Sequence, residues 1–349
     1  MILNNKNVDT SKQPIFLGEP LSLQRYDIIK YPIFMDLFNK QVMCFWRPEE
    51  ISIMLDRGQF KDLAEHEQFI FTKNLLFQTM LDSVVARGVP TFTKYVSLPE
   101  VEICLNTWGF FESIHSYSYS YIIQNVYSDP TTVLNQALED KEILARANSV
   151  TRAYDELNNE KFNLKEKIYL SLISVNILEA IRFYVSFVCA FAFAENKKMI
   201  GNADIIKLIK RDEALHLTTT QTLLRLLKNE SSEGFQDVIK SKESEAIQMF
   251  IEAAEEEKKW ASYLFQYGSI LGLNADILHK YIEWLTDSRL HTLGFQKIFN
   301  TRNPISGWTE PYMNSAAVQP CPQETEITSY LKNSTVNDIT DMDFGNLTL

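Results

Sequence analysis

The sequence predicts an all-α protein, a bundle of long helices, and two observations lead to that fold class. Glycine and proline together make up only 22 of the 349 residues, about half their usual share. With 22 Phe and 15 Tyr and few turn-forming residues, the composition favours long helices over many short strands. The motif Glu-x-x-His also occurs twice, as Glu112 with His115 and Glu213 with His216, 101 residues apart. Helix residues three apart share a face, so each motif directs a carboxylate and an imidazole into the bundle interior.

The two motifs belong to a repeated pattern that predicts a dinuclear metal site. Each follows an apolar segment with a single carboxylate, Asp82 or Glu179, at spacings of 30 and 34 residues. Ferritin-like di-iron bundles are built this way. Four carboxylates and two neutral imidazoles would bring four negative charges into an apolar interior, and two divalent cations would cancel them. Oxygen and nitrogen ligands suit iron or manganese, whereas a structural zinc site would favour thiolates.

The first part of the chain predicts an arm followed by two helices. Residues 1–30 are expected to form an extended N-terminal arm, because two prolines and a glycine punctuate them. The ferritin-like helical domain should occupy residues 31–300. Its first ligand helix is expected over about 65–87, where Asp82 falls on an apolar helical stripe. The second, over about 97–127, opens on a capping box with proline in its first turn and carries the first Glu-x-x-His motif.

The rest of the bundle is predicted from helical periodicity and turn signals. These helices are expected over about 131–157, 165–195, 203–228, 243–271 and 275–299. The first of them shows no obvious chemistry. The second is long and apolar and supplies Glu179, and the third carries the second Glu-x-x-His motif.

One segment is long and apolar enough to cross a membrane. It spans residues 171–194 and contains Asn176, Glu179 and Arg182. Charged groups are expensive in lipid, whereas a central bundle helix can carry them when a metal and partner groups neutralise them. We therefore expect a buried helix and no membrane association.

Charge, cysteine usage and the absence of other motifs argue against further classes of protein. The formal net charge is −11 without a cluster of lysine or arginine, so we expect no direct nucleic-acid binding. The four cysteines are scattered, and residues 1–10 contain no apolar signal-peptide core, which indicates a reduced, cytoplasmic protein. The sequence contains no glycine-rich phosphate loop and no nucleophile elbow.

Residues 301–349 are predicted to form an irregular segment and a flexible C-terminal tail. Four prolines prevent a continuous helix, and the chain from Lys332 is rich in Asn, Ser, Thr and Asp. Phe344, Leu347 and Leu349 are spaced apolar residues at its end. They fit either a peptide that orders in a partner's groove or a simple disordered terminus.

Tyr119 is the tyrosine that the spacing places beside the predicted metal site. It lies four residues after His115 and seven after Glu112, so the three side chains project within one narrow sector of the helix. The apolar residues that can close over this phenol are Phe183, Phe187 and Ile209. Such a dry pocket would protect an oxidised tyrosine, and an ordinary core tyrosine is the alternative interpretation.

Asp212 immediately precedes Glu213 and points about 100° away from it, behind the predicted ligands. It can accept the second ring N–H of a ligating histidine, or it can form a simple surface pair with Arg211. Packing or surface positions are the default expectation for Trp46, Trp108, His66, His279 and His291.

Five runs of the sequence resemble the small, radical-generating subunit of class I ribonucleotide reductases, in the tyrosyl-radical, di-iron (class Ia-like) form. These runs are residues 45–50, 81–83, 112–116 with Tyr119, 176–187 and 211–216. The resemblance covers nearly the whole chain. Two stretches depart from the family pattern: the connection 158–164 is shorter than in members with a hairpin there, and residues 340–349 match only loosely.

The resemblance implies a cofactor of two iron ions per chain and a role for each predicted ligand. The implied ligands are Asp82, Glu112 and His115 for one iron and Glu179, Glu213 and His216 for the other, with Glu112 and Glu213 shared. Oxygen cleavage at the reduced centre would leave a stable radical on Tyr119. Manganese could replace one or both irons.

The resemblance also implies a partner and a route. A large catalytic subunit would receive the oxidising equivalent and reduce ribonucleotides to deoxyribonucleotides. The implied route is His115, Asp212, Trp46 and then Tyr330 in the tail. Glu50 and Glu324 match positions linked to subunit coupling, and the terminal residues resemble the peptide that docks on the large subunit. A homodimer is implied as well.

Two other functions are open to a ferritin-like metal protein. Iron storage or transport needs a cage-forming surface, and it would explain neither a Trp46–Asp212 pair nor an anchored tail. A di-iron oxygenase needs an open substrate pocket beside the metals. The crowding by Phe183, Phe187 and Ile209 predicts that such a pocket is absent.

Overall fold

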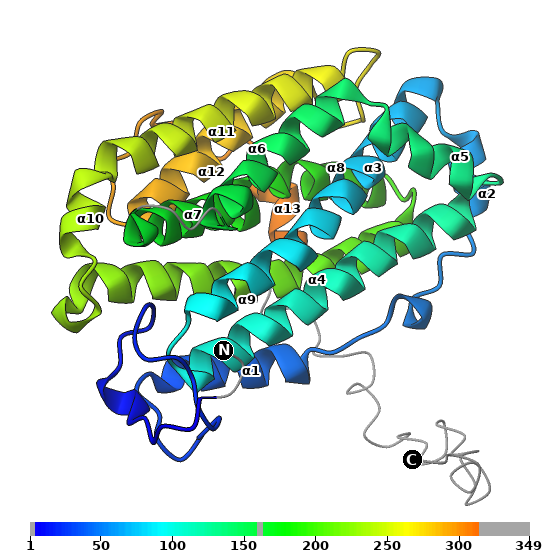
Figure 1. Ribbon diagram of the computed structural model, residues 1–349. Helices are drawn as coiled ribbons and strands as arrows, with labels where there is room; N and C mark the ends of the chain where they lie inside the picture. The colour runs from blue at the N-terminus through cyan, green and yellow to red at the C-terminus, as the bar shows by residue number, and fades with distance from the viewer. Residues whose placement is uncertain (1–3, 159–162, 314–349) are drawn as a thin grey trace, which may run out of the picture.

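A computed structural model of the protein describes residues 4–158 and 163–313. In these ranges the only β pairing consists of two isolated bridges, and the long helices lie side by side in one bundle (Figure 1). The predicted all-α fold is therefore confirmed. The α-helices are α1 (Pro32–Met43), α2 (Asp56–Asp62), α3 (Glu65–Gly88), α4 (Pro99–Val126), α5 (Pro130–Asn135), α6 (Lys141–Asn158), α7 (Leu164–Ile177), α8 (Tyr184–Glu195), α9 (Ile200–Asn229), α10 (Gln236–Ser241), α11 (Glu243–Leu264), α12 (Ala275–Thr292) and α13 (Ser306–Met313).

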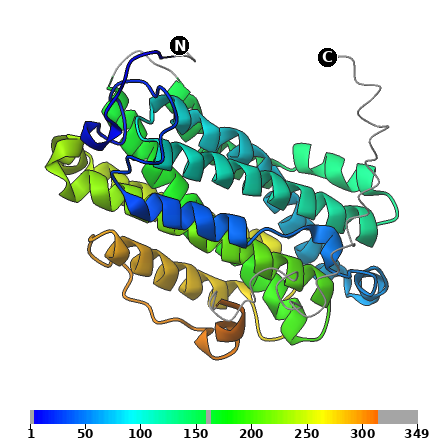
Figure 2. The same cartoon turned by 90° about the horizontal axis from the view of Figure 1, so that it is seen from below.

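The centre of the bundle is formed by α3, α4, α9 and the segment that contains α7 and α8. Helix α3 packs along α4, and both α7 and α8 pack against α9. Helices α11 and α12 pair with each other and cover one side (Figure 1). Figure 2 shows α1 running along the bundle, where it contacts α4 and α9. Apolar side chains from all these helices form one continuous core, so the helices that carry the predicted ligands face each other in an apolar interior.

Local sequence explains where the ligand helices begin. At the start of α3, the Glu67 carboxylate accepts a hydrogen bond of 3.1 Å from the backbone N–H of Ala64, which satisfies a free donor of the first turn. Pro99 opens α4, where its missing N–H costs no helical hydrogen bond. The buried Asp56 carboxylate accepts a hydrogen bond of 2.6 Å from the N–H of Asn202 and so anchors the start of α9.

The single helix predicted over 131–157 is wrong, because the chain forms α5 and α6 with a break before Lys141. Asp140 occupies the break. One of its oxygens accepts hydrogen bonds from Lys73 Nζ (2.7 Å) and Tyr263 OH (2.8 Å). The other accepts the free backbone N–H of Ile143 (3.2 Å) in the first turn of α6. Tertiary contacts to α3 and α11 therefore end one helix and start the next.

The helix predicted over 165–195 contains a π-helical turn, Leu178–Arg182, between α7 and α8. The apolar run contains neither proline nor glycine, so the sequence carried no signal for an interruption. Such turns often occur at functional sites, and this one includes Glu179. The whole segment Leu164–Glu195 is long and apolar enough to cross a membrane, but 94% of its apolar window is buried inside the protein. A buried central helix is the environment that the sequence predicted for it.

Two predicted helix ends lie too far along the chain. Helix α11 ends at Leu264 instead of about 271, and α12 ends at Thr292 instead of about 299. After α12, Gly294 adopts a φ of +80°, a conformation that glycine reaches without steric cost. The Asp287 carboxylate then accepts the N–H groups of three successive residues, 298–300, which holds the chain in a turn.

The segments before α3 and after α12 contain short helices that the sequence did not predict. These are α1 and α2 before α3 and α13 in the segment expected to be irregular. In the described part of the arm, the buried Glu233 carboxylate accepts hydrogen bonds from Ile15 N (2.6 Å) and Lys30 Nζ (2.7 Å). The division into arm (1–30), helical domain (31–300) and tail (301–349) remains a prediction.

Candidate metal centre

Six side chains predicted as metal ligands meet at the centre of the bundle. They are Asp82 from α3, Glu112 and His115 from α4, Glu179 from the π-helical turn, and Glu213 and His216 from α9, and each is 0% exposed. Their potential ligand atoms form two groups, and within each group all atoms lie within 4.8 Å of one another. Glu112 and Glu213 belong to both groups. We call these six side chains the metal centre.

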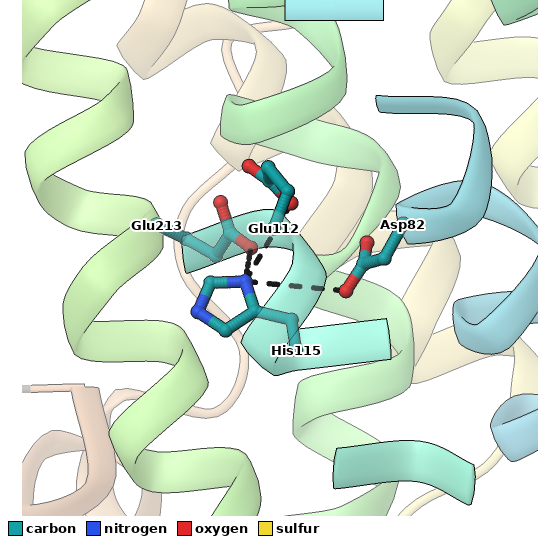
Figure 3. Close-up of side chains that lie close together, drawn as sticks. All are labelled: Asp82, Glu112, His115 and Glu213. Carbon is teal, nitrogen blue, oxygen red and sulfur yellow. Dashed lines mark ion pairs between the residues drawn. The ribbon is translucent and has the colours of Figure 1, made fainter. Parts of the chain in front are cut away.

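The first group surrounds the His115 ring, as Figure 3 shows. His115 Nδ1 lies 3.0 Å from Glu213 Oε1 and 3.6 Å from Glu112 Oε2. The same nitrogen lies 4.0 Å from Asp82 Oδ2. One ion between these atoms would therefore have three carboxylates and one imidazole within reach.

The second group surrounds the His216 ring in the same way. His216 Nδ1 lies 3.0 Å from both Glu112 Oε1 and Glu213 Oε2, and 4.0 Å from Glu179 Oε2. Glu112 and Glu213 thus turn one oxygen toward each histidine. Two carboxylates placed in this way can bridge two neighbouring cations.

The centre contains more buried acceptors than the described protein groups can satisfy. Both oxygens of Asp82 and both of Glu179 have no hydrogen-bond partner, and neither do Glu112 Oε2 and Glu213 Oε1. Buried polar groups are normally paired, because an unpaired one costs free energy. The donor set is oxygen and nitrogen without thiolate, which fits iron or manganese. The residues therefore fit a pair of divalent cations, although their role as ligands remains a prediction.

The ionisation of the centre reflects the crowding of four carboxylates. Burial raises the pKa of Asp82 and that of Glu179 well above their usual values, and neighbouring carboxylates add to the effect. Burial alone would also raise the pKa of Glu213, but its close contacts with Glu179 and with both imidazoles lower it overall. Burial opposes the charged form of His216, yet the surrounding carboxylates raise its pKa to about 8. Without a cation, protons take over part of the charge compensation.

Asp212 lies behind His115, on the side away from the other carboxylates. His115 Nε2 lies 3.3 Å from Asp212 Oδ2, and Trp46 Nε1 donates a hydrogen bond of 2.7 Å to the same oxygen. The Arg211 guanidinium pairs with Asp212 Oδ1 at 2.9 Å. Arg211 is 5% exposed and Asp212 is 2% exposed, so the pair predicted as a surface alternative exists but is buried. Trp46, 0% exposed, is joined to the metal centre through one carboxylate.

Trp108 contacts the metal centre directly, although the sequence suggested only a packing role. Its Nε1 donates a hydrogen bond of 2.6 Å to Glu112 Oε1, and its ring stacks on His216 at 4.9 Å between centroids. Glu112 lies four residues after Trp108, a spacing that places both side chains on one face of α4. That spacing was a signal in the sequence that the prediction did not use.

Tyr119 is 0% exposed, as are Phe183, Phe187 and Ile209, which were predicted to surround it, and all four belong to the same core. Burial raises the pKa of Tyr119 well above its usual value, and the charges of the Asp82 and glutamate carboxylates raise it further. Gln78 Nε2 lies 3.5 Å from the phenol oxygen, a contact that the sequence did not predict. Burial and the neighbouring carboxylates therefore both favour the neutral phenol of Tyr119.

The remaining predicted residues lie elsewhere. Glu50 ends the short turn Pro48–Glu50, and Glu324, Tyr330 and the terminal peptide lie outside the described residues. Two cavities of about 450 Å³ and 400 Å³ are lined by none of the six side chains of the metal centre.

Comparison with known proteins gives one consistent family. The sequence model of the family described as ribonucleotide reductase, small chain, matches residues 25–304. The ribonucleoside-diphosphate reductase subunit beta of Buchnera aphidicola (subsp. Acyrthosiphon pisum) is 46% identical, with 98% of each chain covered. Ribonucleoside-diphosphate reductase 1 subunit beta of Escherichia coli O157:H7 is 42% identical over 98% of this chain and 97% of that one.

A solved structure agrees with these sequence matches. The ribonucleotide reductase R2 subunit from Clostridium botulinum superposes with a TM-score of 0.81 at 31% identity, covering 90% of this chain and 98% of the other. The predicted ferritin-like bundle and the resemblance stated from the motifs are both confirmed. The chain belongs to the ribonucleotide reductase small chain family.

Proposed function

We propose that this chain is the radical-generating small subunit of a class I ribonucleoside-diphosphate reductase, with a stable radical on Tyr119. Enzymes of this family are oxidoreductases, and a small chain implies a large subunit as its partner. The observation that carries the proposal is the pair of overlapping carboxylate and imidazole groups that share Glu112 and Glu213. Tyr119, fully buried one helical turn after His115, supplies the residue to be oxidised.

The six side chains of the metal centre would hold two iron ions. Asp82 and His115 would belong to one ion, Glu179 and His216 to the other, and the two remaining glutamates to both. Manganese could occupy the same oxygen and nitrogen ligands. When bound, the metal pair would supply the oxygen-derived oxidising power that removes one electron from Tyr119.

The surrounding residues would protect and transmit that oxidising equivalent. The buried apolar residues Phe183, Phe187 and Ile209 would exclude water and reductants from the oxidised side chain of Tyr119. Asp212 would hold the His115 ring in place and connect it to Trp46 through the contacts of 3.3 Å and 2.7 Å. From Trp46, the route would continue through Tyr330 to the large subunit.

Assembly follows from the same proposal. We infer that the C-terminal tail docks on the large subunit, that the chain forms a homodimer and that it works in the cytoplasm. Deleting the residues from Asp341 onward should abolish association with the large subunit and leave metal binding intact. Replacing Tyr330→Phe should spare both assembly and the resting radical while stopping nucleotide reduction.

Electron paramagnetic resonance tests the central claim. Metal-free protein receives ferrous iron and oxygen, and bound iron is quantified per chain. The wild type should bind two irons and show an organic radical, and Tyr119→Phe should bind the same iron without that signal. Tyr169→Phe, a change at another buried tyrosine (2% exposed), serves as the control and should keep the signal. A wild type that binds iron but gives no organic radical would overturn the proposal and favour storage or oxygenase function.

A further inference from the structure

A second cluster of charged side chains, three of them buried, lies beside the metal centre. It consists of Arg146 from α6, Arg182 from the π-helical turn, and Glu256 and Glu257 from α11. The side chains of Arg146, Arg182 and Glu257 are 6%, 7% and 0% exposed, and that of Glu256 is 36% exposed. We call these four residues the charge network. Its two cations and two anions balance, in contrast to the metal centre.

The contacts within the charge network form a chain. Arg146 Nη2 donates a hydrogen bond to Glu257 Oε1, and the same oxygen lies 3.6 Å from Arg182 Nη1. Arg182 Nη2 lies 2.7 Å from Glu256 Oε2 and also donates a hydrogen bond of 3.1 Å to Ser149 Oγ. Each carboxylate therefore lies within ion-pair distance of a guanidinium, and the side-chain contacts of Arg182 run to α6 and α11.

Aromatic rings fix the far end of this chain. The guanidinium carbon of Arg146 lies 3.4 Å from the ring centroid of Phe77 and 4.4 Å from that of Trp260. Both rings are fully buried, and a planar guanidinium on aromatic faces is a favourable arrangement. Arg146 is thereby held in one place, and it holds Glu257 within reach of Arg182.

Arg182 shares the π-helical turn with Glu179, three residues earlier. Opposite charges three residues apart on an α-helix are neighbours and pair with each other. In the described part of the chain, however, the ion pairs of Arg182 run to Glu256 and Glu257 and not to Glu179. Both Glu179 oxygens instead remain without a hydrogen-bond partner and belong to the second ligand group.

We propose that the charge network is a positioning device that keeps Arg182 away from Glu179, so that Glu179 stays available to bind a cation. The inference rests on the proposed metal centre and adds a role for residues outside it. A guanidinium paired with Glu179 would neutralise one ligand and repel the incoming ion. Glu256 and Glu257 supply the negative charge that Arg182 would otherwise find on Glu179.

Manganous ion alone, added to the full chain without oxygen, tests this idea. Free Mn(II) is followed by electron paramagnetic resonance, and the wild type should bind two ions per chain. Glu256→Gln removes the charge of the closest partner of Arg182 and keeps the size of the side chain. We expect the affinity for one of the two ions to fall about 10-fold to 100-fold, as is usual when a group supporting a ligand is lost.

The decisive variant is the double change Glu256→Gln with Arg182→Met. It removes the cation that would move to Glu179 and leaves Arg146 balanced by Glu257, so the lost affinity should return. A network that only braced the fold would make the double variant weaker than the single one. Circular dichroism checks folding, and Glu255→Gln, an exposed change on the same helix (53% exposed), should bind Mn(II) as the wild type does.

The outcomes separate this inference from the proposed function. Unchanged Mn(II) affinity in Glu256→Gln overturns the inference alone, as does a loss that Arg182→Met fails to reverse. A wild-type chain that binds fewer than two ions overturns the proposed metal centre and this inference with it.

Discussion

The metal centre and the charge network are buried in the same bundle and meet at the π-helical turn Leu178–Arg182, yet their charges are arranged in opposite ways. In the charge network, each carboxylate lies within 4 Å of a guanidinium. In the metal centre, four carboxylates face only two imidazoles and no guanidinium. Atoms without a hydrogen-bond partner occur in both clusters, six oxygens in the metal centre and five nitrogen or oxygen atoms in the charge network. Most members of both clusters are buried, so it is the imbalance of charge that distinguishes the proposed cation site from a structural ion network.

Removing a carboxylate from each cluster should therefore change the stability of the metal-free protein in opposite directions. The largest effect is expected for Glu257→Gln, which leaves two buried guanidinium groups with only the half-exposed Glu256. Breaking one partner of a buried ion pair typically costs about 3–5 kcal/mol. Chemical denaturation of the metal-free chain should show a loss of this size in the free energy of unfolding.

An exposed pair on the same helix provides the control. Glu255 lies 2.9 Å from Lys258 and is 53% exposed, so Glu255→Gln should cost less than about 1 kcal/mol. Equal losses in the free energy of unfolding for Glu255→Gln and Glu257→Gln would show that the buried ion pairs stabilise the protein no more than an exposed pair does. The contrast with the metal centre would then disappear.

The opposite sign is expected for Asp82→Leu in the metal centre. Leucine has the branching of aspartate, and the change removes a buried acid whose two oxygens have no hydrogen-bond partner. The metal-free protein should gain about 1–3 kcal/mol in the free energy of unfolding, while the number of bound Mn(II) ions falls from two to one. A metal-free variant that is less stable than the wild type would mean that protein groups already compensate the Asp82 carboxylate. The expected contrast between the two clusters would then be wrong.

The sequence was sufficient to predict that these six side chains lie together, because the information for it is local, and their role as metal ligands stays a prediction. Glu112 with His115 and Glu213 with His216 are each fixed to one helix face by a three-residue spacing. Asp82 can also be recognised from local sequence, because it is an acid on an apolar stripe of its helix. The structure brings all six side chains together, as the sequence predicted.

The features that the sequence missed depend on contacts between distant segments. The break before α6 follows from the bonds of Asp140 to Lys73 and Tyr263, and the charge network joins α6 to α11 through Arg146 and Glu257. Neither pairing has a local pattern. The π-helical turn likewise lies in an apolar run whose composition is that of an ordinary buried helix, so only the packing around it reveals the turn.

Asp212→Asn tests whether the metal centre, unlike the internally balanced charge network, depends on charges outside it. Asp212 faces His115 on one side and the Arg211 guanidinium on the other. Without the Asp212 charge, the His115 imidazole should be oriented less firmly. The affinity for one of the two Mn(II) ions should then fall about 10-fold to 100-fold. Competition with a metal-sensitive dye measures both sites, and an equal loss at both would argue that the variant disturbs the whole bundle.

The smallest effect is expected for Trp108→Phe, which keeps an aromatic ring against His216 but removes the hydrogen bond of 2.6 Å to Glu112 Oε1. A hydrogen bond to a charged group contributes about 1.5 kcal/mol or somewhat more, which corresponds to roughly tenfold in affinity. Because Glu112 belongs to both ligand groups, the loss should be spread over both ions, in contrast to the single-ion loss expected for Asp212→Asn. A loss confined to one ion in the same dye competition would mean that Glu112 serves a single metal, and the two groups would then not share it.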